Sequence, residues 1–216
     1  MSENRTGAFS LVLVPALLTL IVTVVRVVGE LQGWNPTFFS KPGGGSAVVG
    51  ITWLVLVFGF WFGWRLRRPG SPPPGKAALL YLTGIAVLAG GMIGLVQLGL
   101  VTLPSRESPG EPTGLAYGFA LLAVAAVVAV FAWPRLTGTL MLYGVLARIP
   151  VVVVTYLDLH YDWHTHYGEL PPGAVTADPF IALCTPQVTL WPFVFTPLVG
   201  GLLGCLGAAM AGRRRG

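Results

Sequence analysis

Long apolar runs dominate the chain, and short stretches rich in proline, glycine and charged residues separate them. Six of these runs are close to twenty residues long and cover about residues 8–29, 47–66, 78–101, 114–133, 136–158 and 188–212. A hydrocarbon core of about 30 Å takes roughly 20 helical residues to cross. Lipid offers the backbone no hydrogen-bond partner, so each run is expected to be an α-helix. The pattern predicts an all-α, six-transmembrane-helix bundle that forms a single membrane domain over residues 1–216.

The composition supports this interpretation and excludes a water-soluble domain. Of the 216 residues, 54% are hydrophobic and 10% are charged, whereas a soluble domain carries about 25% charged residues. The first run is too long for the apolar part of a signal peptide and has no small-residue cleavage site after it, so we expect a retained helix. In the last run, Pro186, Pro192 and Pro197 predict a kinked or broken helix.

The distribution of charge predicts the orientation. One set of chain ends and loops holds most of the basic residues: Arg5, Arg65, Arg67, Arg68, Lys76, Arg135, Arg213, Arg214 and Arg215. The other set holds Lys41 and Arg106 together with most of the acidic residues. Because cytoplasmic loops carry an excess of Lys and Arg, we expect a multi-pass protein of the cell or inner membrane with both termini in the cytoplasm. Basic residues at helix ends meet anionic lipid headgroups. This explains the net charge of +5, and we expect no nucleic-acid partner.

All three histidines fall in one short segment of the outer loop 159–187, directly after the fifth predicted helix. If that helix continues for one turn, His160 and His164 share a face, and His166, Asp162 or Glu169 completes a tetrahedral set of ligands. Imidazole with carboxylate suits zinc best, with copper or iron as weaker candidates. Two alternatives stay open. The segment is either an aromatic belt in which the histidines are incidental, or a sensor of external pH.

Two arginines lie within the predicted helices. Arg148 falls near the middle of the fifth helix, where an Arg costs about 2.5–3.5 kcal/mol and usually faces the protein interior. We expect it either to satisfy backbone carbonyls freed by Pro150 or to bind an anion such as a lipid phosphate, a quinone oxygen or a carboxylate. Arg26 lies four residues before Glu30 near the outer end of the first helix, where the two side chains are expected to pair. Arg26 then anchors the helix end or contributes to an outer-face anion or lipid site.

Small residues spaced four apart predict close helix contacts within the chain or between subunits. They are Gly59 and Gly63, Gly90 and Gly94, and Gly200, Gly204 and Ala208. Other features are missing from the predicted helices: without a histidine they offer no internal bis-His haem ligands, and without a lysine they offer no site for a retinal Schiff base.

Three functions remain after these exclusions. The first is a metal-binding or ligand-binding site on the extracytoplasmic face, after the fifth helix. The second is a structural or accessory subunit of a larger membrane complex, or a homo-oligomer. The third is an anion or lipid transporter that uses Arg148. The sequence leaves the enzymatic question open, and it assigns no catalytic residue.

Overall fold

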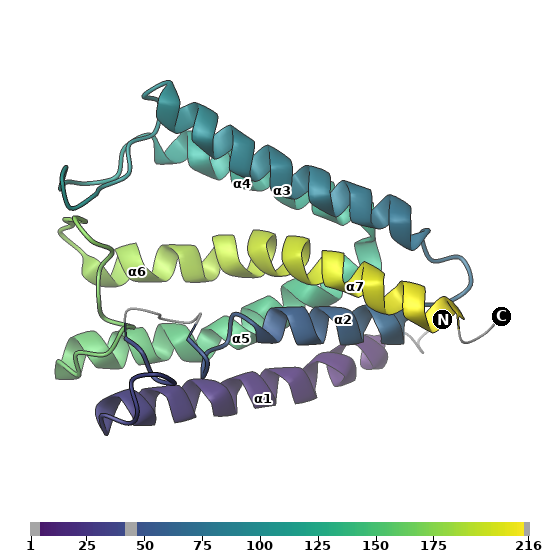
Figure 1. The fold of residues 1–216 in the computed structure, drawn as a ribbon, viewed down its shortest axis with the longest axis horizontal. Helices are drawn as coiled ribbons and strands as arrows, with labels where there is room; N and C mark the ends of the chain where they lie inside the picture. The colour runs from purple at the N-terminus through teal and green to yellow at the C-terminus, as the bar shows by residue number, and fades with distance from the viewer. Residues whose placement is uncertain (1–4, 42–46, 214–216) are drawn as a thin grey trace.

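The computed structural model describes residues 5–41 and 47–213, and in this part of the chain the fold is helical (Figure 1). The elements are α1 (Arg5–Leu31), α2 (Leu54–Leu66), α3 (Pro74–Gln97), α4 (Leu115–Ala132), α5 (Pro134–Tyr161), α6 (Pro179–Val188), the π-helix η2 (Trp191–Phe195) and α7 (Thr196–Arg213). Extended pairing among the described residues is limited to two isolated bridges: Thr102 with Thr113 inside the α3–α4 connection, and Gly110 of that connection with Ala174 between α5 and α6. The predicted all-α class is therefore confirmed.

Five helical stretches are long and apolar enough to cross a membrane. The exception among the six predicted spans is the second. α2 has only 13 residues, which at 1.5 Å per residue amounts to about 20 Å. Residues 47–53, expected to belong to this helix, form bends and turns instead. Side chains take over the hydrogen bonds of this segment: the carbonyl of Val48 accepts from the Trp53 indole at 3.0 Å, and that of Val49 accepts from Arg26 at 3.2 Å.

The last predicted span is longer than expected. An apolar helical stretch of 34 residues runs from Pro179 to Gly212, so the outer loop ends at Asp178, whose carboxylate caps α6 by accepting from the Ile181 N–H at 3.0 Å. The stretch changes to a π-helix at Trp191–Phe195. Pro192 has no N–H to continue the α-helical pattern, and the rare π-helical turns of proteins occur mostly as single turns inside α-helices.

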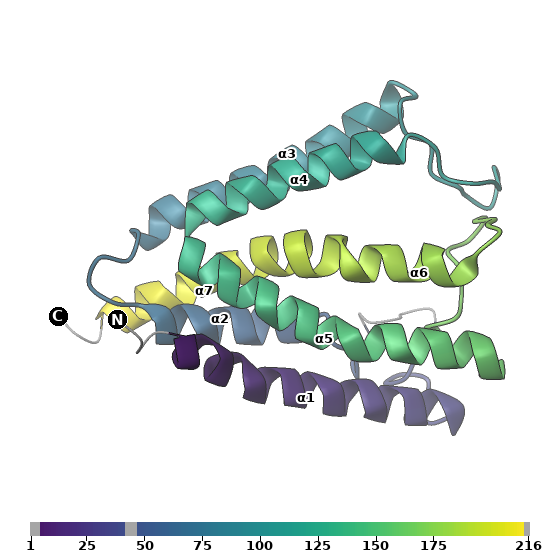
Figure 2. The same ribbon diagram turned by 180° about the vertical axis from the view of Figure 1, so that it is seen from behind.

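The helices form a bundle from which the α3–α4 hairpin leans away at one end (Figures 1 and 2). α2 and α7 pack side by side, and glycines make the close approach possible: a Cβ built on Gly59 would lie 2.6 Å from the Cα of Gly200, and one on Gly63 would overlap the carbonyl of Gly204. The predicted close contacts are confirmed for these four glycines. A Cβ built on Gly90 or Gly94 would meet nothing within 4 Å.

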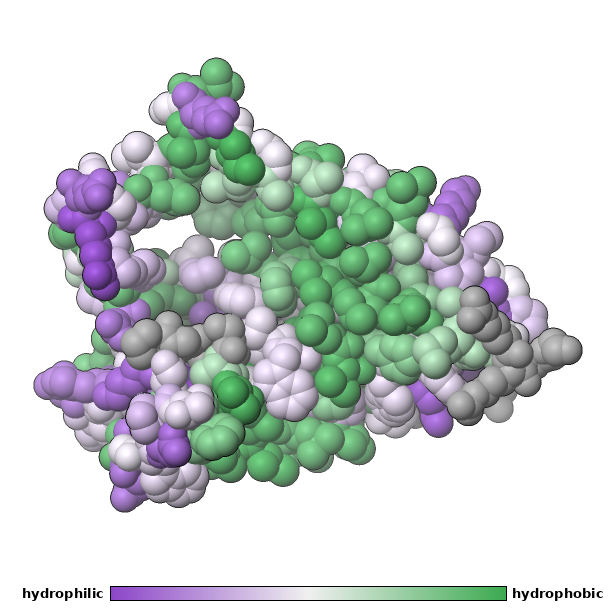
Figure 3. Space-filling view, in the orientation of Figure 1, coloured by the Kyte–Doolittle hydropathy of each residue, from purple (hydrophilic) through white to green (hydrophobic). Residues whose placement is uncertain are grey.

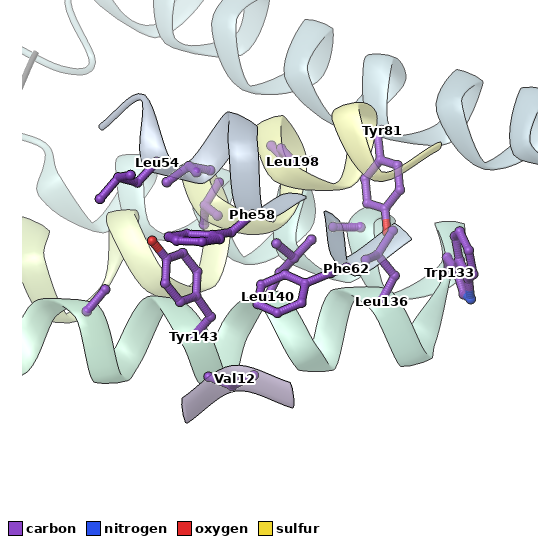
Figure 4. Packing of buried hydrophobic residues seen from close by; sticks show 14 of the residues in the cluster. Val12, Leu54, Phe58, Phe62, Tyr81, Trp133, Leu136, Leu140, Tyr143 and Leu198 are labelled. Atoms are coloured by element: carbon purple, nitrogen blue, oxygen red, sulfur yellow. The ribbon is translucent and has the colours of Figure 1, made fainter. Parts of the chain in front are cut away.

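Aromatic and aliphatic side chains fill the centre of the bundle (Figure 4). The Tyr143 ring lies 5.4 Å from that of Phe58 and 5.7 Å from that of Phe62, measured between centroids. Its hydroxyl pairs with Thr19 at 2.9 Å, which ties α5 to α1. Figure 3 shows apolar residues across the middle of the visible face and polar residues at both ends, as expected for a bundle surrounded by lipid.

Candidate functional site

Arg148 lies at the middle of α5 and is 7% exposed. Its side chain points at α6 and η2: Nη1 donates to Oε1 of Gln187 at 2.9 Å, and the guanidinium carbon lies 4.2 Å from the centre of the Trp191 ring. The prediction that Arg148 faces other helices is confirmed. Its hydrogen bond goes to the side chain of Gln187 and not to a carbonyl freed by Pro150.

The broken helix on the other side positions these two partners. Pro186 and Pro192 flank Gln187 and Trp191, which lie four residues apart on either side of the change from α6 to η2. Residues four apart on a helix share a face, so the amide and the indole both reach the guanidinium. The irregular segment therefore builds one wall of the Arg148 site.

A cavity of about 320 Å³ opens beside Arg148. Two of its lining side chains, Arg148 and Gln187, are polar, and the remainder are apolar: Val145, Ile149, Val152, Val153, Val188, Pro192 and Phe193. Several of the apolar residues are strongly exposed at the helix surface, among them Ile149 at 52% and Val188 at 51%. The cavity thus opens through the apolar side of the bundle and not through its polar ends. We call it the Arg148 crevice.

Arg148 has no carboxylate partner among the residues that the structure describes. The three ion pairs found there are Arg26 with Glu30, His164 with Asp162, and His166 with Glu30. A guanidinium has five N–H donors. Within the described chain, the guanidinium of Arg148 donates to one acceptor, Oε1 of Gln187. The crevice therefore presents a nearly buried positive charge and unused donors to an apolar cavity.

Arg26 has a very different environment near the C-terminal end of α1. Its Nε is hydrogen-bonded to Oε1 of Glu30, Nη1 donates to the carbonyls of Phe38 and Val49 at 3.2 Å each, and Nη2 donates to the carbonyl of Ser40 at 2.5 Å. Arg26 thus pairs with Glu30 as predicted, and its side chain is buried; its predicted roles as an anchor or as part of an anion or lipid site stay untested. Its role is to hold the irregular segment between α1 and α2.

Glu30 also fixes the loop that follows α5. Its carboxylate contacts Nδ1 of His166 at 2.6 Å and accepts from the His166 N–H at 3.0 Å. Asp158, in the last turn of α5, accepts from the loop N–H groups of Thr165 at 3.3 Å and Gly168 at 2.8 Å. These contacts join residues far apart in the sequence into one network at the end of the bundle where α1 and α5 finish (Figure 1). We call Arg26, Glu30 and His166 the Arg26 triad.

Tyr167 lies in this loop between the two arginine sites. Its side chain is buried, and it interacts electrostatically with Arg26, Glu30 and Arg148. Burial is the main cause that raises the pKa of the Tyr167 phenol, so the hydroxyl stays neutral. The residue adds no charge that would compensate Arg148.

The structure separates the three histidines. α5 ends at Tyr161 and Asp162 adopts a left-handed conformation at φ 55°, so the extra helical turn that would align His160 with His164 does not form. The His160 ring stacks on Tyr156 at 5.7 Å, and His164 pairs with exposed Asp162 at 3.0 Å. Glu169 is exposed. Over the described ranges, no three His, Cys, Asp or Glu side chains gather in a metal-binding group; metal binding stays an untested prediction.

Sequence reasoning singled out Arg148 and Arg26 but missed Gln187, Trp191 and Tyr167. Gln187 could have been identified from the sequence, since it is a polar side chain inside a long apolar stretch. Tyr167 could not, because its burial depends on how the loop after α5 folds back. Comparisons with protein-family models, curated proteins and solved structures find no match to this chain.

Proposed function

We propose that this chain is a membrane protein that binds a lipid-soluble ligand, carrying an anionic or hydrogen-bond-accepting head group, in the Arg148 crevice. The observation that carries the proposal is a buried guanidinium that faces an apolar cavity without a carboxylate partner among the described residues. An Arg at the centre of a membrane helix costs about 2.5–3.5 kcal/mol, and intramembrane charges usually mark ligand or ion sites. An anionic head group would neutralise that charge.

The direction of access supports a ligand taken from the membrane. The apolar rim of the crevice, which includes Ile149 and Val188, is exposed on the side of the bundle. In a bilayer this surface meets acyl chains, so an amphiphile can enter sideways with its head group toward Arg148. Binding of this kind is the first step of lipid or anion transport and of lipid handling in general.

Within this proposal the chain spans the membrane six times, with both termini in the cytoplasm. α1 runs from one end of the bundle to the other and α3 starts again at the first end (Figure 1), so the segment containing α2 must return across the molecule. The excess of Lys and Arg at the end where α2 finishes and α3 begins supports a cytoplasmic position for that end.

Cysteine-accessibility labelling tests this topology. In a variant lacking Cys184 and Cys205, Ser71→Cys should react only after the membrane is opened, and Glu169→Cys should react in intact cells or spheroplasts. The reverse pattern would overturn the orientation. Labelling of both positions from the same side would overturn the odd number of crossings between them, which are α3, α4 and α5.

The binding proposal is tested by what the purified protein carries. Wild type, Arg148→Gln and the matched control Arg135→Gln, which removes an exposed arginine from the inner end of the same helix, are extracted with organic solvent and analysed by mass spectrometry. We expect wild type and Arg135→Gln to carry the same amphiphile and Arg148→Gln to be depleted of it. Equal lipid content in all three proteins would contradict the proposal.

A second candidate function is that of an accessory subunit in a membrane complex. The observation in its favour is the face of α3 at Gly90 and Gly94, where an added Cβ would meet nothing within 4 Å. Small residues let helices of two chains approach closely in lipid. Size-exclusion chromatography of the protein in mild detergent, followed by identification of co-purifying chains, tests this alternative, and Gly90→Leu should release the partner.

A further inference from the structure

We infer that the ligand of the Arg148 crevice is a single-chain monocarboxylate, that is, an alkyl chain ending in one carboxylate of the fatty-acid type. This inference rests on the proposed function and specifies its ligand. Four features of the crevice lead to it: its charge, the distribution of its polar atoms, the open edge of the guanidinium and its size.

The charge of the site favours a monoanion. Arg148 supplies one positive charge, and the three ion pairs within the described ranges involve other residues. A head group with one negative charge gives a neutral pair inside the bundle. A dianionic phosphate monoester would leave one negative charge unpaired in an apolar cavity, and a neutral quinone would leave the arginine uncompensated; both outcomes are costly.

The polar atoms of the crevice favour a small head group. Arg148 and Gln187 are the two polar lining side chains, and the other walls are aliphatic or aromatic. A phospholipid head carries ester, glycerol and often hydroxyl oxygens as well as the phosphate. Most of these would lose their water without gaining a partner, which is unfavourable for each group. A carboxylate has two oxygens, and the available donors suffice for both.

The orientation of the guanidinium favours a planar acceptor. Trp191 covers one face of the group at 4.2 Å, and Nη1 is directed at Gln187. The donors that remain lie in the guanidinium plane, and two parallel N–H···O bonds from such an edge match a carboxylate. Since Oε1 of Gln187 accepts from Arg148, its amide nitrogen is left as a further donor beside the head group.

The size of the crevice fits the head and the first part of a chain. A volume of about 320 Å³ lies at the lower end of the range of small-molecule pockets, roughly 300–1,000 Å³. It is too small to enclose a two-chain lipid. The remainder of a single chain can follow the exposed apolar rim at Ile149 and Val188 into the bilayer.

Equilibrium binding of radiolabelled palmitate to the purified, delipidated protein in detergent tests the inference. Three unlabelled competitors share the chain and differ in the head group: palmitate, the corresponding alcohol and the corresponding alkyl phosphate. Phosphatidylglycerol and a short-tailed quinone represent other classes of membrane amphiphile. We expect palmitate to compete best and the alcohol to be about 10- to 100-fold weaker, the factor for losing hydrogen bonds to a charged group. Arg148→Gln should weaken palmitate binding by a similar factor, and Arg135→Gln should bind as wild type does.

A second pair of variants guards against misfolding of Arg148→Gln. Ile149→Trp places a bulky side chain in the rim of the crevice and should abolish palmitate binding. Leu159→Trp makes the same change at an exposed position of α5 that does not line the crevice and should bind palmitate normally. Equal binding by these two variants would overturn the inference.

The competition also separates this inference from the proposed function. If the alkyl phosphate, phosphatidylglycerol or the quinone binds as tightly as palmitate or more tightly, and Arg148→Gln weakens that binding, the carboxylate assignment is wrong and the proposed function stands. If no amphiphile binds in a way that depends on Arg148, both are wrong.

Discussion

Two buried arginines in this protein occupy opposite kinds of environment. Arg26, in the Arg26 triad, is 1% exposed, pairs with Glu30 and donates to the backbone carbonyls of Phe38, Ser40 and Val49. Arg148, in the Arg148 crevice, is 7% exposed, donates to one amide oxygen and stacks on an indole. Most hydrogen-bond donors of Arg26 thus have acceptors within the chain, whereas Arg148 has donors that are unused.

The difference shows how a buried charge can be assigned a role. Where a carboxylate and several carbonyls surround a guanidinium, its desolvation is compensated within the chain, and removing it leaves partners unpaired. Where a guanidinium faces an apolar cavity, no group of the chain neutralises its charge, and a bound ligand can do so. Burial alone does not distinguish the two cases, but the count of satisfied donors does.

The largest effect on stability should come from Arg26→Met. This change leaves the Glu30 carboxylate buried beside His166 and removes the donors for three backbone carbonyls, so we expect a loss of about 3–5 kcal/mol. Thermal unfolding in detergent, followed by circular dichroism or by intrinsic tryptophan fluorescence, measures it. Arg148→Met is the matched control, with the same substitution at the other buried arginine. Equal destabilisation by the two variants would remove the distinction between the sites.

A smaller loss is expected for Glu30→Gln. The amide keeps the shape of the side chain but removes the charge that Arg26 and His166 contact, and hydrogen bonds to charged groups contribute about 1.5–3 kcal/mol. The three carbonyl contacts of Arg26 remain, so the loss should be less than in Arg26→Met. The same unfolding measurement checks this order. A greater loss in Glu30→Gln would show that the ion pair outweighs the carbonyl contacts in holding the segment before α2.

The smallest effect on stability is expected for Arg148→Met in the ligand-free protein, with a change of less than about 1 kcal/mol. Loss of one hydrogen bond and of the stacking on Trp191 is offset by removal of an uncompensated buried charge, since apolar replacements of buried ions are often neutral. Unfolding of delipidated wild type and variant side by side provides the measurement. A loss as large as that of Arg26→Met would mean that Arg148 is structural.

Most of the helical layout could be predicted from the sequence, because lipid solvation depends on local composition. An apolar run of sufficient length strongly favours a helix in lipid, and five of the six predicted runs correspond to long apolar helical stretches. The failure at residues 47–53 has an identifiable cause. There Arg26 and Trp53 donate hydrogen bonds to backbone carbonyls, which allows an apolar segment to stay irregular. A hydropathy pattern does not reveal such partners.

The candidate sites were only partly predictable for the same reason. The unusual position of Arg148 in the middle of a helix was visible in the sequence, and so was the spacing of Arg26 and Glu30. The metal-site prediction for the histidine segment stays untested, but the helical alignment of His160 with His164 that it assumed does not form, because α5 ends at Tyr161. His166 then turns to Glu30, which lies 136 residues away in the chain.

The sequence by itself determined that the chain forms apolar helices, and it determined which charged residues lie within them, because both properties depend on a window of about twenty residues. The tertiary structure alone decided which arginine is compensated and which is not. Gln187 lies 39 residues from Arg148 and Val49 lies 23 residues from Arg26, so neither contact belongs to any local pattern. The physical reason is that electrostatic compensation depends on distance in space, and only helix packing and the irregular segments between helices set that distance.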